Sequence, residues 1–426
     1  MKLFSKIETI PVQSSRGPLA TAAARVEELE ETGFTVLRWG LVQLRSGSVA
    51  VELALADCPI PGITPVASRR GDFPVTGGRQ VRTAIVVPTG VGASMGGFIA
   101  DAGPFARAVA AVASLTIVHP NVVNGGDFYG ASDDTLYVDG MTLDQFFLGR
   151  VRLGWPRTRR IGLLIESMPK DEIQIILNAA NAVRAIYGID IVAFDLTDEP
   201  IGGEICRSQY GHFTGSVEKP EHLLKSVDRL QRAGADAIAV VTTCGGTTRD
   251  DWSSHYTDSG PNPVGMLEAL ISRFITRATG LPAAHAPAYG DSIGAFSGIV
   301  DPRAAGEVAS GTGLPCVLRG LSVAPDTLAS GGIGVEDLTS IIVPTDCSGG
   351  IPAWGAQHQG IPLLAVRSNH CRIGVAADQL NGPPVVMVET PAEALAWLAC
   401  TRAGVAWDLI RSSPTPLRSV RDLLDC

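Results

Sequence analysis

The sequence lacks the features that mark several large classes of protein. Its 426 residues contain no apolar run of the ~20 residues that a membrane-spanning helix needs. The opening segment Met1–Lys6 has no apolar stretch of the kind found in secretory signals. Acidic residues outnumber basic ones by 43 to 34, so no excess of cations is available to offset nucleic-acid phosphates. We therefore expect neither a membrane nor a nucleic acid as a partner.

The eight cysteines also lack a pattern. They are scattered without a CxxC pair, and a disulfide framework is uncommon in a chain of this length. Without a secretory signal, the expected compartment is the cytoplasm. Hydrophobic residues make up 45% of the chain, charged residues only 18%, and the mean hydropathy is +0.21. This composition predicts two or three domains with ample cores and favours a homo-oligomer.

What the sequence does have is one pattern that occurs three times. Each copy is an apolar, mostly β-branched run, followed by one or two threonines and a glycine-rich loop. The copies cover residues 84–97, 237–246 and 340–350. A second apolar run follows each copy, at 115–121, 282–287 and 362–369. Strand, loop, helix and second strand make a βαβ unit, and such units build parallel sheet.

The predicted fold is therefore α/β, with parallel sheets from repeated βαβ units in two or three pseudo-related lobes. Residues 160–195 add a further strand, helix and strand. Residues 1–80 are predicted to form a small α+β module and a linker, with a helix at 21–32 and a hairpin at 35–53. We place the first α/β lobe at 81–235 and the second, with two repeat units, at 236–426.

The candidate catalytic residues are Cys244 and Cys347, which occupy matching positions in two glycine-rich loops. In parallel sheets the loops after the strand ends collect ligands. If the repeats are related in space, both thiols face one crevice some ~7–8 Å wide and can act as acid and base at one carbon. Nearby backbone N–H groups at a helix N-terminus would favour the thiolates. Either cysteine could instead merely pack, because free cysteine is among the most buried residues.

The other candidate positions are polar or glycine residues around these cysteines and in the matching loops. We expect their hydroxyl, amide and N–H groups to bind a substrate carboxylate or carbonyl. The asparagines could equally cap turns. These positions are Thr89, Gly90, Ser94, His119, Asn121, Thr243, Gly245, Gly246, His285, Thr345, Ser348, Gly349 and Asn369.

Neither a cofactor nor a metal is expected. Gly90–Gly96 is close to a dinucleotide-binding fingerprint, but that fingerprint needs an acidic residue at the end of the next strand. That strand ends in His119-Pro120-Asn121 instead. A zinc site at His119, His285 and His370 is an alternative, but these histidines are too far apart in the sequence for a metal-binding signature.

Two short segments carry resemblances to enzyme families. Thr243–Gly246 and Asp346–Ser348 resemble the Asp/Glu racemase superfamily, which places a Cys followed by Thr or Asn after a strand in each of two lobes. The threefold repeat also resembles cyanuric acid hydrolase and barbiturase, which set three Ser–Lys pairs around a cyclic imide. Ser94 and Ser348 could supply serines there. None of the five lysines lies in a repeat loop, so that chemistry is not expected to be shared.

Longer phrases resemble an uncharacterised family. Val87–Ser94, His119–Asn124 and Ile342–Thr345 look like the domain-of-unknown-function family 3326 of bacteria and plants, and the resemblance covers about residues 80–380. It implies a soluble enzyme and supplies no activity.

We predict a cofactor-independent enzyme that acts by proton transfer, as an isomerase, racemase or lyase, on a small carboxylate-bearing metabolite. Cys244 and Cys347 are its expected acid/base pair. One alternative is a hydrolase of a cyclic amide or imide with a Cys or Ser nucleophile. A second alternative is a bilobal small-molecule binding protein.

Overall fold

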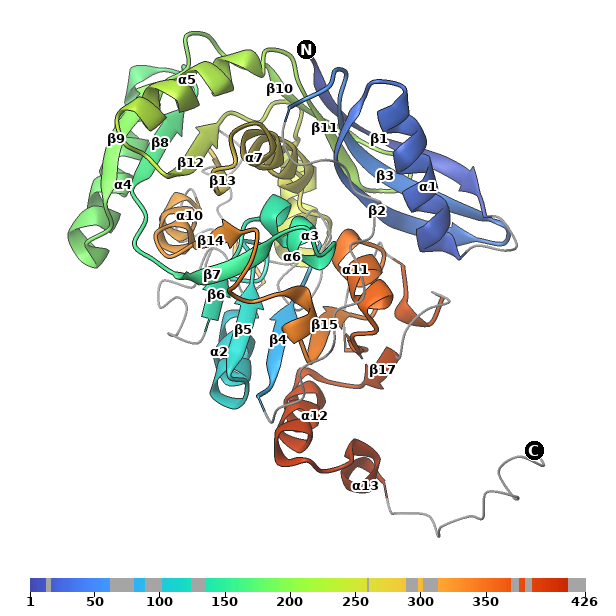
Figure 1. Cartoon of the computed structure of the whole chain (residues 1–426). Coiled ribbons are helices and arrows are strands. Elements are labelled where there is room, and N and C mark those ends of the chain that lie inside the picture. Colours follow the sequence, from blue (N-terminus) through green and yellow to red (C-terminus); the bar gives the residue numbers. More distant parts are fainter. Residues whose placement is uncertain are drawn as a thin grey trace, which may run out of the picture.

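The computed structural model describes residues 1–12, 17–61, 80–88, 102–123, 135–258, 260–288, 298–301, 313–368, 375–379 and 385–412. Three larger sheets organise these residues, and two of them are parallel throughout (Figure 1). The predicted α/β class with parallel sheets from βαβ units is confirmed, and an antiparallel sheet stands beside the parallel ones.

The six-stranded parallel sheet contains the first and third repeats, and its strand order is β17-β16-β15-β4-β5-β6. From β4 the chain continues to β5 and β6 towards one edge of the sheet. From β15 it continues to β16 and β17 towards the opposite edge. The strand order therefore reverses between β4 and β15. The elements are β4 (Arg82–Ile85), α2 (Ala102–Val112), β5 (Leu115–Val118), β6 (Thr135–Tyr137), β15 (Ser340–Pro344), α11 (Ile351–Gln359), β16 (Leu363–Val366), β17 (Val385–Val388), α12 (Pro391–Ala403) and α13 (Trp407–Arg411).

The four-stranded parallel sheet contains the second repeat and has the order β13-β12-β8-β9. Its order reverses between β8 and β12. Helix α4 begins with Asp171 and Glu172 and ends at Gly188 with φ 67°, as expected from helix-dipole and C-cap rules. The elements are β8 (Ile161–Ile165), α4 (Lys170–Tyr187), β9 (Ile191–Leu196), α5 (Glu221–Arg232), β12 (Ala237–Thr242), α6 (Arg249–Asp258), α7 (Gly265–Thr279), β13 (Ala283–Pro287) and α10 (Leu314–Leu321).

The antiparallel sheet has the order β10-β11-β1-β3-β2. The predicted N-terminal helix and hairpin are present, but two strands from the middle of the chain complete the sheet. Helix α1 packs on one face and α7 on the other. The elements are β1 (Leu3–Pro11), α1 (Pro18–Glu31), β2 (Thr35–Arg45), β3 (Ser48–Ala56), β10 (Gly203–Arg207) and β11 (Phe213–Val217).

The expected boundary between residues 235 and 236 runs through the four-stranded sheet. Strands β8 and β9 precede it, and β12 and β13 follow it. The six-stranded sheet likewise takes three strands from each side, because the chain leaves it after β6 and returns at β15. A two-stranded ribbon and short helices connect the sheets: α3 (Gly140–Phe147), β7 (Arg152–Pro156), β14 (Pro325–Leu328), η1 (Val335–Asp337) and η2 (Ala377–Gln379).

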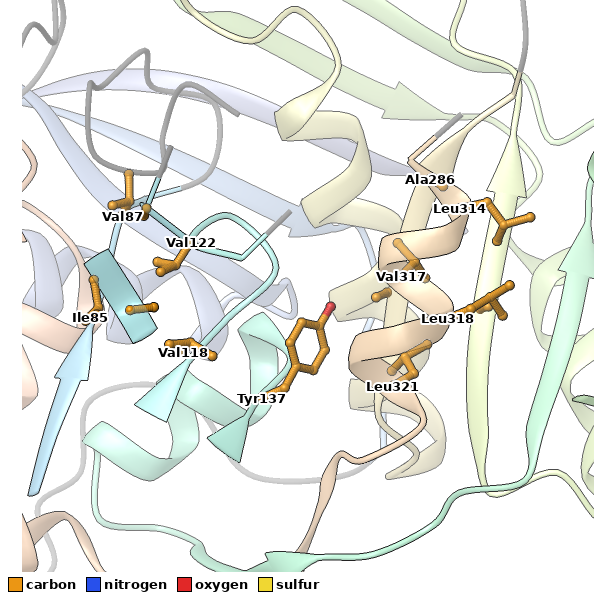
Figure 2. Close-up of a cluster of buried hydrophobic side chains, with 14 of the residues drawn as sticks. Ile85, Val87, Val118, Val122, Tyr137, Ala286, Leu314, Val317, Leu318 and Leu321 are labelled. Carbon is orange, nitrogen blue, oxygen red and sulfur yellow. The ribbon is translucent and has the colours of Figure 1, made fainter. Parts of the chain in front are cut away.

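One hydrophobic cluster joins the two parallel sheets. Figure 2 shows Tyr137 of β6 pointing towards α10, whose other side faces Ala286 of β13. An ideal Cβ on Gly320 of α10 would lie 2.3 Å from the Tyr137 ring, so a glycine is needed for this close packing. Burial raises the pKa of Tyr137. Among the residues that the structure describes, no helix is long and apolar enough to cross a membrane.

Candidate functional site

A recess lies where the strand order of the six-stranded sheet reverses. Ligands of open parallel sheets bind at this place, outside the carboxyl ends of the strands. The recess is small: the space within it that a water-sized sphere can occupy is about 20 Å³, which is room for about one water molecule. One wall follows β4 and β15, and the other comes from the antiparallel sheet and from His212, the residue before β11. The lining residues are Pro88, Asp346, Cys347, Gly349, Gly350, Arg38, Gly40, Leu41, Val42, Glu52 and His212.

The two walls touch at one end of the recess. The Leu41 amide donates to the carbonyl of Gly349 at 2.6 Å, and Gly40 forms an antiparallel bridge with Gly350. An ideal Cβ on Gly349 would lie 2.7 Å from the Leu41 carbonyl oxygen, so only glycine allows this approach. Strand β2 therefore closes the recess against the loop after β15.

Backbone hydrogen bonds hold the loop after β15 in place. The Cys347 amide donates to the Pro344 carbonyl at 2.9 Å, and the Val375 amide donates to the Asp346 carbonyl at 2.6 Å. Helix α11 then begins after Gly350, with a proline in its first turn. The N-terminus of this helix directs its positive dipole end towards the recess, which favours an anion there.

A buried ion pair forms the far wall. Arg38 Nη1 and Glu52 Oε2 are 2.5 Å apart, and both side chains are almost fully buried. They belong to neighbouring strands β2 and β3, and Gly40 lies directly opposite Glu52. A buried pair of this kind holds its partners in one geometry, because separating them would leave a charge unpaired.

His212 places a neutral imidazole on the same wall. Burial lowers its pKa, Arg38 lowers it further, and Glu52 acts in the opposite direction. The side chain is buried, and its Nε2 has no hydrogen-bond partner among the described residues. Buried polar atoms are normally paired, so this nitrogen is available to a bound molecule.

Asp346 and Cys347 line the same recess from the loop after β15. Burial raises the pKa of Asp346, and the nearby Asp378 raises it further. Cys347 is only 5% exposed and lines the recess. A carboxyl with a raised pKa and a neutral imidazole on opposite walls are the groups that general acid–base chemistry uses.

The corresponding place in the four-stranded sheet is occupied by Glu166, which follows β8. Its Oε2 accepts hydrogen bonds from the amide and the hydroxyl of Thr243, each at 2.6 Å. Its Oε1 accepts from the Ile201 amide, also at 2.6 Å. Thr243 was predicted to bind substrate, but these groups already bind an internal carboxylate.

The glycines after β12 are also used internally. The Gly245 amide donates to Gly203, and the Gly245 carbonyl accepts from Ile205 of β10. Gly246 has a φ of 86°, and an ideal Cβ there would lie 2.2 Å from the Ile205 carbonyl oxygen. The structure therefore shows Gly245 and Gly246 joining two sheets, in contrast to the predicted role in substrate binding.

Cys244 does not have the environment expected of a thiolate. Burial raises its pKa, and the carboxyl groups of Glu268 and Glu166 raise it further. Its Sγ lies 3.9 Å from the Thr242 carbonyl oxygen, and the side chain packs against the cluster beneath α7. The expected lowering of this pKa is wrong, because two carboxylates and little solvent surround the thiol.

The structure does not place Cys244 and Cys347 in one crevice. The loop with Cys347 bridges β2, whereas the loop with Cys244 bridges Glu204 of β10. Strands β2 and β10 are the opposite edges of the five-stranded sheet, four strand spacings or about 19 Å apart across the sheet. The two thiols also belong to separate hydrophobic clusters. The predicted pairing fails because the second and third repeats lie in different sheets.

His119 and Asn121 hold the chain after β4. His119 Nε2 accepts from the Val87 amide at 3.0 Å, and Asn121 Nδ2 donates to the carbonyls of Val87 and Pro88 at 3.0 and 2.9 Å. Burial, with a smaller contribution from Arg273, lowers the pKa of His119 to about 3. Both residues therefore position the strand end that lines the recess, rather than lining it themselves.

His285 lies in the other parallel sheet. Its Nε2 is 2.8 Å from Thr242 Oγ1, and its Nδ1 is 3.4 Å from Glu268 Oε1. His119 and His285 are therefore apart and separately bonded. Within the described ranges, no group of three or more His, Cys, Asp or Glu side chains could hold a metal ion.

The remaining predicted residues divide into two sets. Thr345 and Ser348 hold the loop through internal hydrogen bonds. The Thr345 carbonyl accepts from the Ala377 amide and from Ser348 Oγ, and Ser348 is fully buried. Of the predicted site residues, the recess brings together Cys347 and Gly349. Four others lie outside the described residues: Thr89, Gly90, Ser94 and Asn369.

Sequence reasoning missed Arg38, Glu52, His212 and Asp346. A signal existed for the first two, because each is a single charge inside an otherwise apolar strand. Opposite charges on the two strands of one hairpin indicate a buried ion pair. For His212 the sequence offers no comparable signal, because its place depends on the pairing of β11 with β1 across about half of the chain.

The comparisons with known proteins place the chain in a family. A family model described as "Protein of unknown function (DUF3326)" matches residues 82–411. The chain belongs to this family. An uncharacterized lipoprotein of Synechococcus sp. (strain ATCC 27144) is 36% identical over 341 residues, which cover 77% of this chain and 92% of that relative. No solved structure matches. The family resemblance predicted from the sequence is confirmed, and the two enzyme resemblances stay predictions.

The name of this DUF3326 relative contradicts the cytoplasmic localisation expected from the sequence. A lipoprotein is attached to a membrane through a covalent lipid, which is not the expected state of a cytoplasmic enzyme. The expectation rested on the composition of the first residues and on the cysteine pattern. Neither of these reports on lipid attachment.

Proposed function

We propose that this DUF3326 protein is an enzyme that transfers protons on a small carboxylate-bearing metabolite in the recess between β4 and β15, without an organic cofactor. One observation carries the proposal. Asp346, Cys347 and His212, whose Nε2 has no hydrogen-bond partner among the described residues, line the same recess at the position where parallel sheets bind ligands. The reaction class remains that of an isomerase, racemase or lyase.

Each group has a role that follows from its surroundings. His212 is neutral at pH 7 and has a free nitrogen, so it serves as one proton carrier. Cys347 serves as the other, and His212 takes the role of its partner that sequence reasoning gave to Cys244. Asp346, whose pKa is raised by burial, lies next to Cys347 and hydrogen-bonds the substrate.

The size of the recess limits the substrate. With about 20 Å³ of space for a water-sized sphere, it is far below the usual range of ligand sites, so its walls must separate to admit even a small metabolite. Binding of an anion is supported by the N-terminus of α11 and by the guanidinium of Arg38. Together these features favour a metabolite of a few carbon atoms.

Proton transfer at carbon can be tested without knowing the substrate. The protein would be incubated in D₂O with a panel of small hydroxy, amino and oxo acids, and loss of each C–H signal would be followed by ¹H NMR. We expect exchange with at least one acid, and we expect Cys347→Ser and His212→Asn each to reduce its rate ~100-fold or more.

Cys244→Ser is the matched control, because Cys244 occupies the same repeat position outside the recess. It should exchange protons at the rate of the unaltered protein. Loss of exchange in Cys244→Ser with normal exchange in Cys347→Ser would contradict the assignment of the site.

A small-molecule binding protein is the second candidate function. It is favoured by the lipoprotein name of the relative and by the two different sheets that form the walls of the recess. In that case the acids would raise the melting temperature without exchange at carbon, and Cys347→Ser would still bind. The hydrolase alternative keeps Cys347 as nucleophile, whereas the buried hydroxyl of Ser348 already donates to Thr345.

A further inference from the structure

Helix α4 has a second apolar stripe, of which its own fold covers only Ala179, in part. Its buried side consists of Ile176, Ala180 and Val183, which pack on the sheet. The second stripe, Ile175, Ala179, Ala182 and Ile186, is displaced from that side by about 100° around the helix. Ile175 is 47% exposed and Ile186 is 71% exposed. These are large values for isoleucines on a helix that already has a buried face.

The neighbouring edge strand adds an aromatic side chain on the same side. Strand β9 is the edge of the four-stranded sheet, and its Leu196 packs in the cluster beneath α4. Asp195 faces the other way and bonds Ser226 and Arg229 of α5. Because side chains alternate along a strand, Phe194 shares the α4 side, and it is 50% exposed. Figure 1 shows α4 and β9 together at one end of the molecule.

The residue types and spacings of the stripe are symmetric about its centre. The spacing from Ile175 to Ala179 is four residues, from Ala179 to Ala182 three, and from Ala182 to Ile186 four. In an antiparallel helix pair related by a twofold axis, each isoleucine therefore meets an isoleucine and each alanine meets an alanine. A symmetric surface of this kind complements itself, which is what an isologous interface requires.

We propose that a second copy of this chain covers the surface formed by the α4 stripe and Phe194. In this dimer the two α4 helices run antiparallel, with Ile175 opposite Ile186 of the partner subunit. The alanines lie at the centre, where small side chains allow the helix axes to approach to about 8 Å. The proposal does not depend on the recess or on its chemistry.

Side chains, rather than strand pairing, make this interface. The register of β9 shifts between Ile191 and Ala193, which leaves Val192 as an extra residue at the edge. Arg229 Nη2 also donates to the Leu196 carbonyl at 3.0 Å. A bulge and a covering side chain are the usual ways to prevent an edge strand from pairing with another strand.

The oligomeric state tests the proposal directly. Sedimentation velocity over a range of concentrations should show a dimer, and Ile186→Glu should raise its dissociation constant ~100-fold or more, because a desolvated charge would face an isoleucine. Ile410→Glu is the matched control, since Ile410 is also exposed, at 62%, but lies on α13. It should leave the dimer unchanged. A monomer at all concentrations would overturn the proposal, and so would a dimer that survives Ile186→Glu.

Disulfide trapping tests the antiparallel register. In a Cys206→Ser background, which removes the exposed thiol among the described residues, Ala179→Cys protein would be mixed with Ala182→Cys protein and oxidised. The mixture should yield more crosslinked dimer than either variant alone, because Ala179 of one copy meets Ala182 of the other. Equal yields in all three samples, or binding of α4 to another protein with no crosslink between copies, would contradict the assignment.

Discussion

The two parallel sheets offer the same topological position, and the protein uses it in opposite ways. In the six-stranded sheet the gap between β4 and β15 is a recess lined by Asp346, Cys347 and His212. In the four-stranded sheet the gap between β8 and β12 is filled by the carboxylate of Glu166, which takes three hydrogen bonds. Both loops carry a cysteine after a threonine-containing strand end.

The difference arises in the neighbouring strand. Glu166 directly follows β8, whereas Val86, Val87 and Pro88 follow β4 and bring no charged group to the gap. The amide and hydroxyl of Thr243 are suited to bind an anion, and an internal anion already occupies them. A glycine-rich loop after a parallel strand therefore becomes a ligand site only where the adjacent strand leaves its donors free.

The largest effect on stability is expected from removing the internal carboxylate. Glu166→Ala leaves the buried Ile201 amide and the two donors of Thr243 without their acceptor and should lower the free energy of unfolding by ~3 kcal/mol. Asp346→Ala removes a carboxyl that burial already disfavours as an anion, and it should cost less than ~1 kcal/mol. Urea unfolding of both variants measures the contrast.

Glu166→Gln is the control, because it retains one acceptor oxygen. Its loss of unfolding free energy should lie between those of Glu166→Ala and Asp346→Ala. Similar losses for Glu166→Ala and Asp346→Ala would remove the distinction between a filled and an open position.

A smaller difference in stability is expected between alanine substitutions at two glycines. Gly246→Ala should destabilise the protein by ~2 kcal/mol, because its φ of 86° and the Ile205 carbonyl both oppose a Cβ. At Gly40 an added Cβ would meet only the Gly349 oxygen at 3.5 Å and Arg38 at 3.8 Å, so Gly40→Ala should stay within ~1 kcal/mol. It should nevertheless weaken ligand binding, since Gly40 lines the recess.

Melting temperatures of the two glycine variants would measure the difference in stability, and ligand titrations would measure the weaker binding by Gly40→Ala. A strongly destabilised Gly40→Ala protein would mean that the recess is more tightly packed than the structure indicates.

The smallest effect, below ~1 kcal/mol between pH 7 and pH 6, is expected from His119, which follows β5 of the six-stranded sheet. The pKa of His119 is lowered to about 3, whereas an unfolded histidine titrates near 6.5. Between these values the unfolded chain binds the extra proton, so the stability due to His119 is present above pH 6.5 and is lost as pH falls. The loss approaches ~1.4 kcal/mol per pH unit.

His119→Gln keeps an acceptor for the Val87 amide and does not titrate. Urea midpoints at pH 7, 6 and 5 should therefore fall less steeply in this variant than in the unaltered protein. Parallel slopes would show that the folded and unfolded states bind the His119 proton equally, and would contradict the lowered pKa.

Much of the fold could be predicted from local patterns. The repeated strand, loop and helix phrases correspond to β4, β12 and β15 with their partner strands, because an apolar run and a glycine loop specify a βαβ unit within a few dozen residues. The arrangement of these units could not be predicted in the same way. Strand β15 pairs with β4 across some 250 residues, and no local signal specifies that choice.

The site was predicted in part for the same reason. Cys347 and Gly349 were found because their loop is part of a repeat. The pairing with Cys244 assumed that matching repeats lie in matching places, and the sheet order shows that they do not. Arg38, Glu52 and His212 reach the recess through the antiparallel sheet, whose strands come from both ends of the first 217 residues.

The contact between β2 and the loop after β15 means that two separate parts of the chain supply the lining of the recess. Arg38, Gly40, Leu41, Val42 and Glu52 line the recess, and all of them precede residue 82, where the match to the family model begins. Nearly half of the residues that line the recess thus lie outside the segment that the family model matches. If the recess binds a ligand as proposed, members of DUF3326 that differ in these N-terminal strands should differ in the ligand they bind.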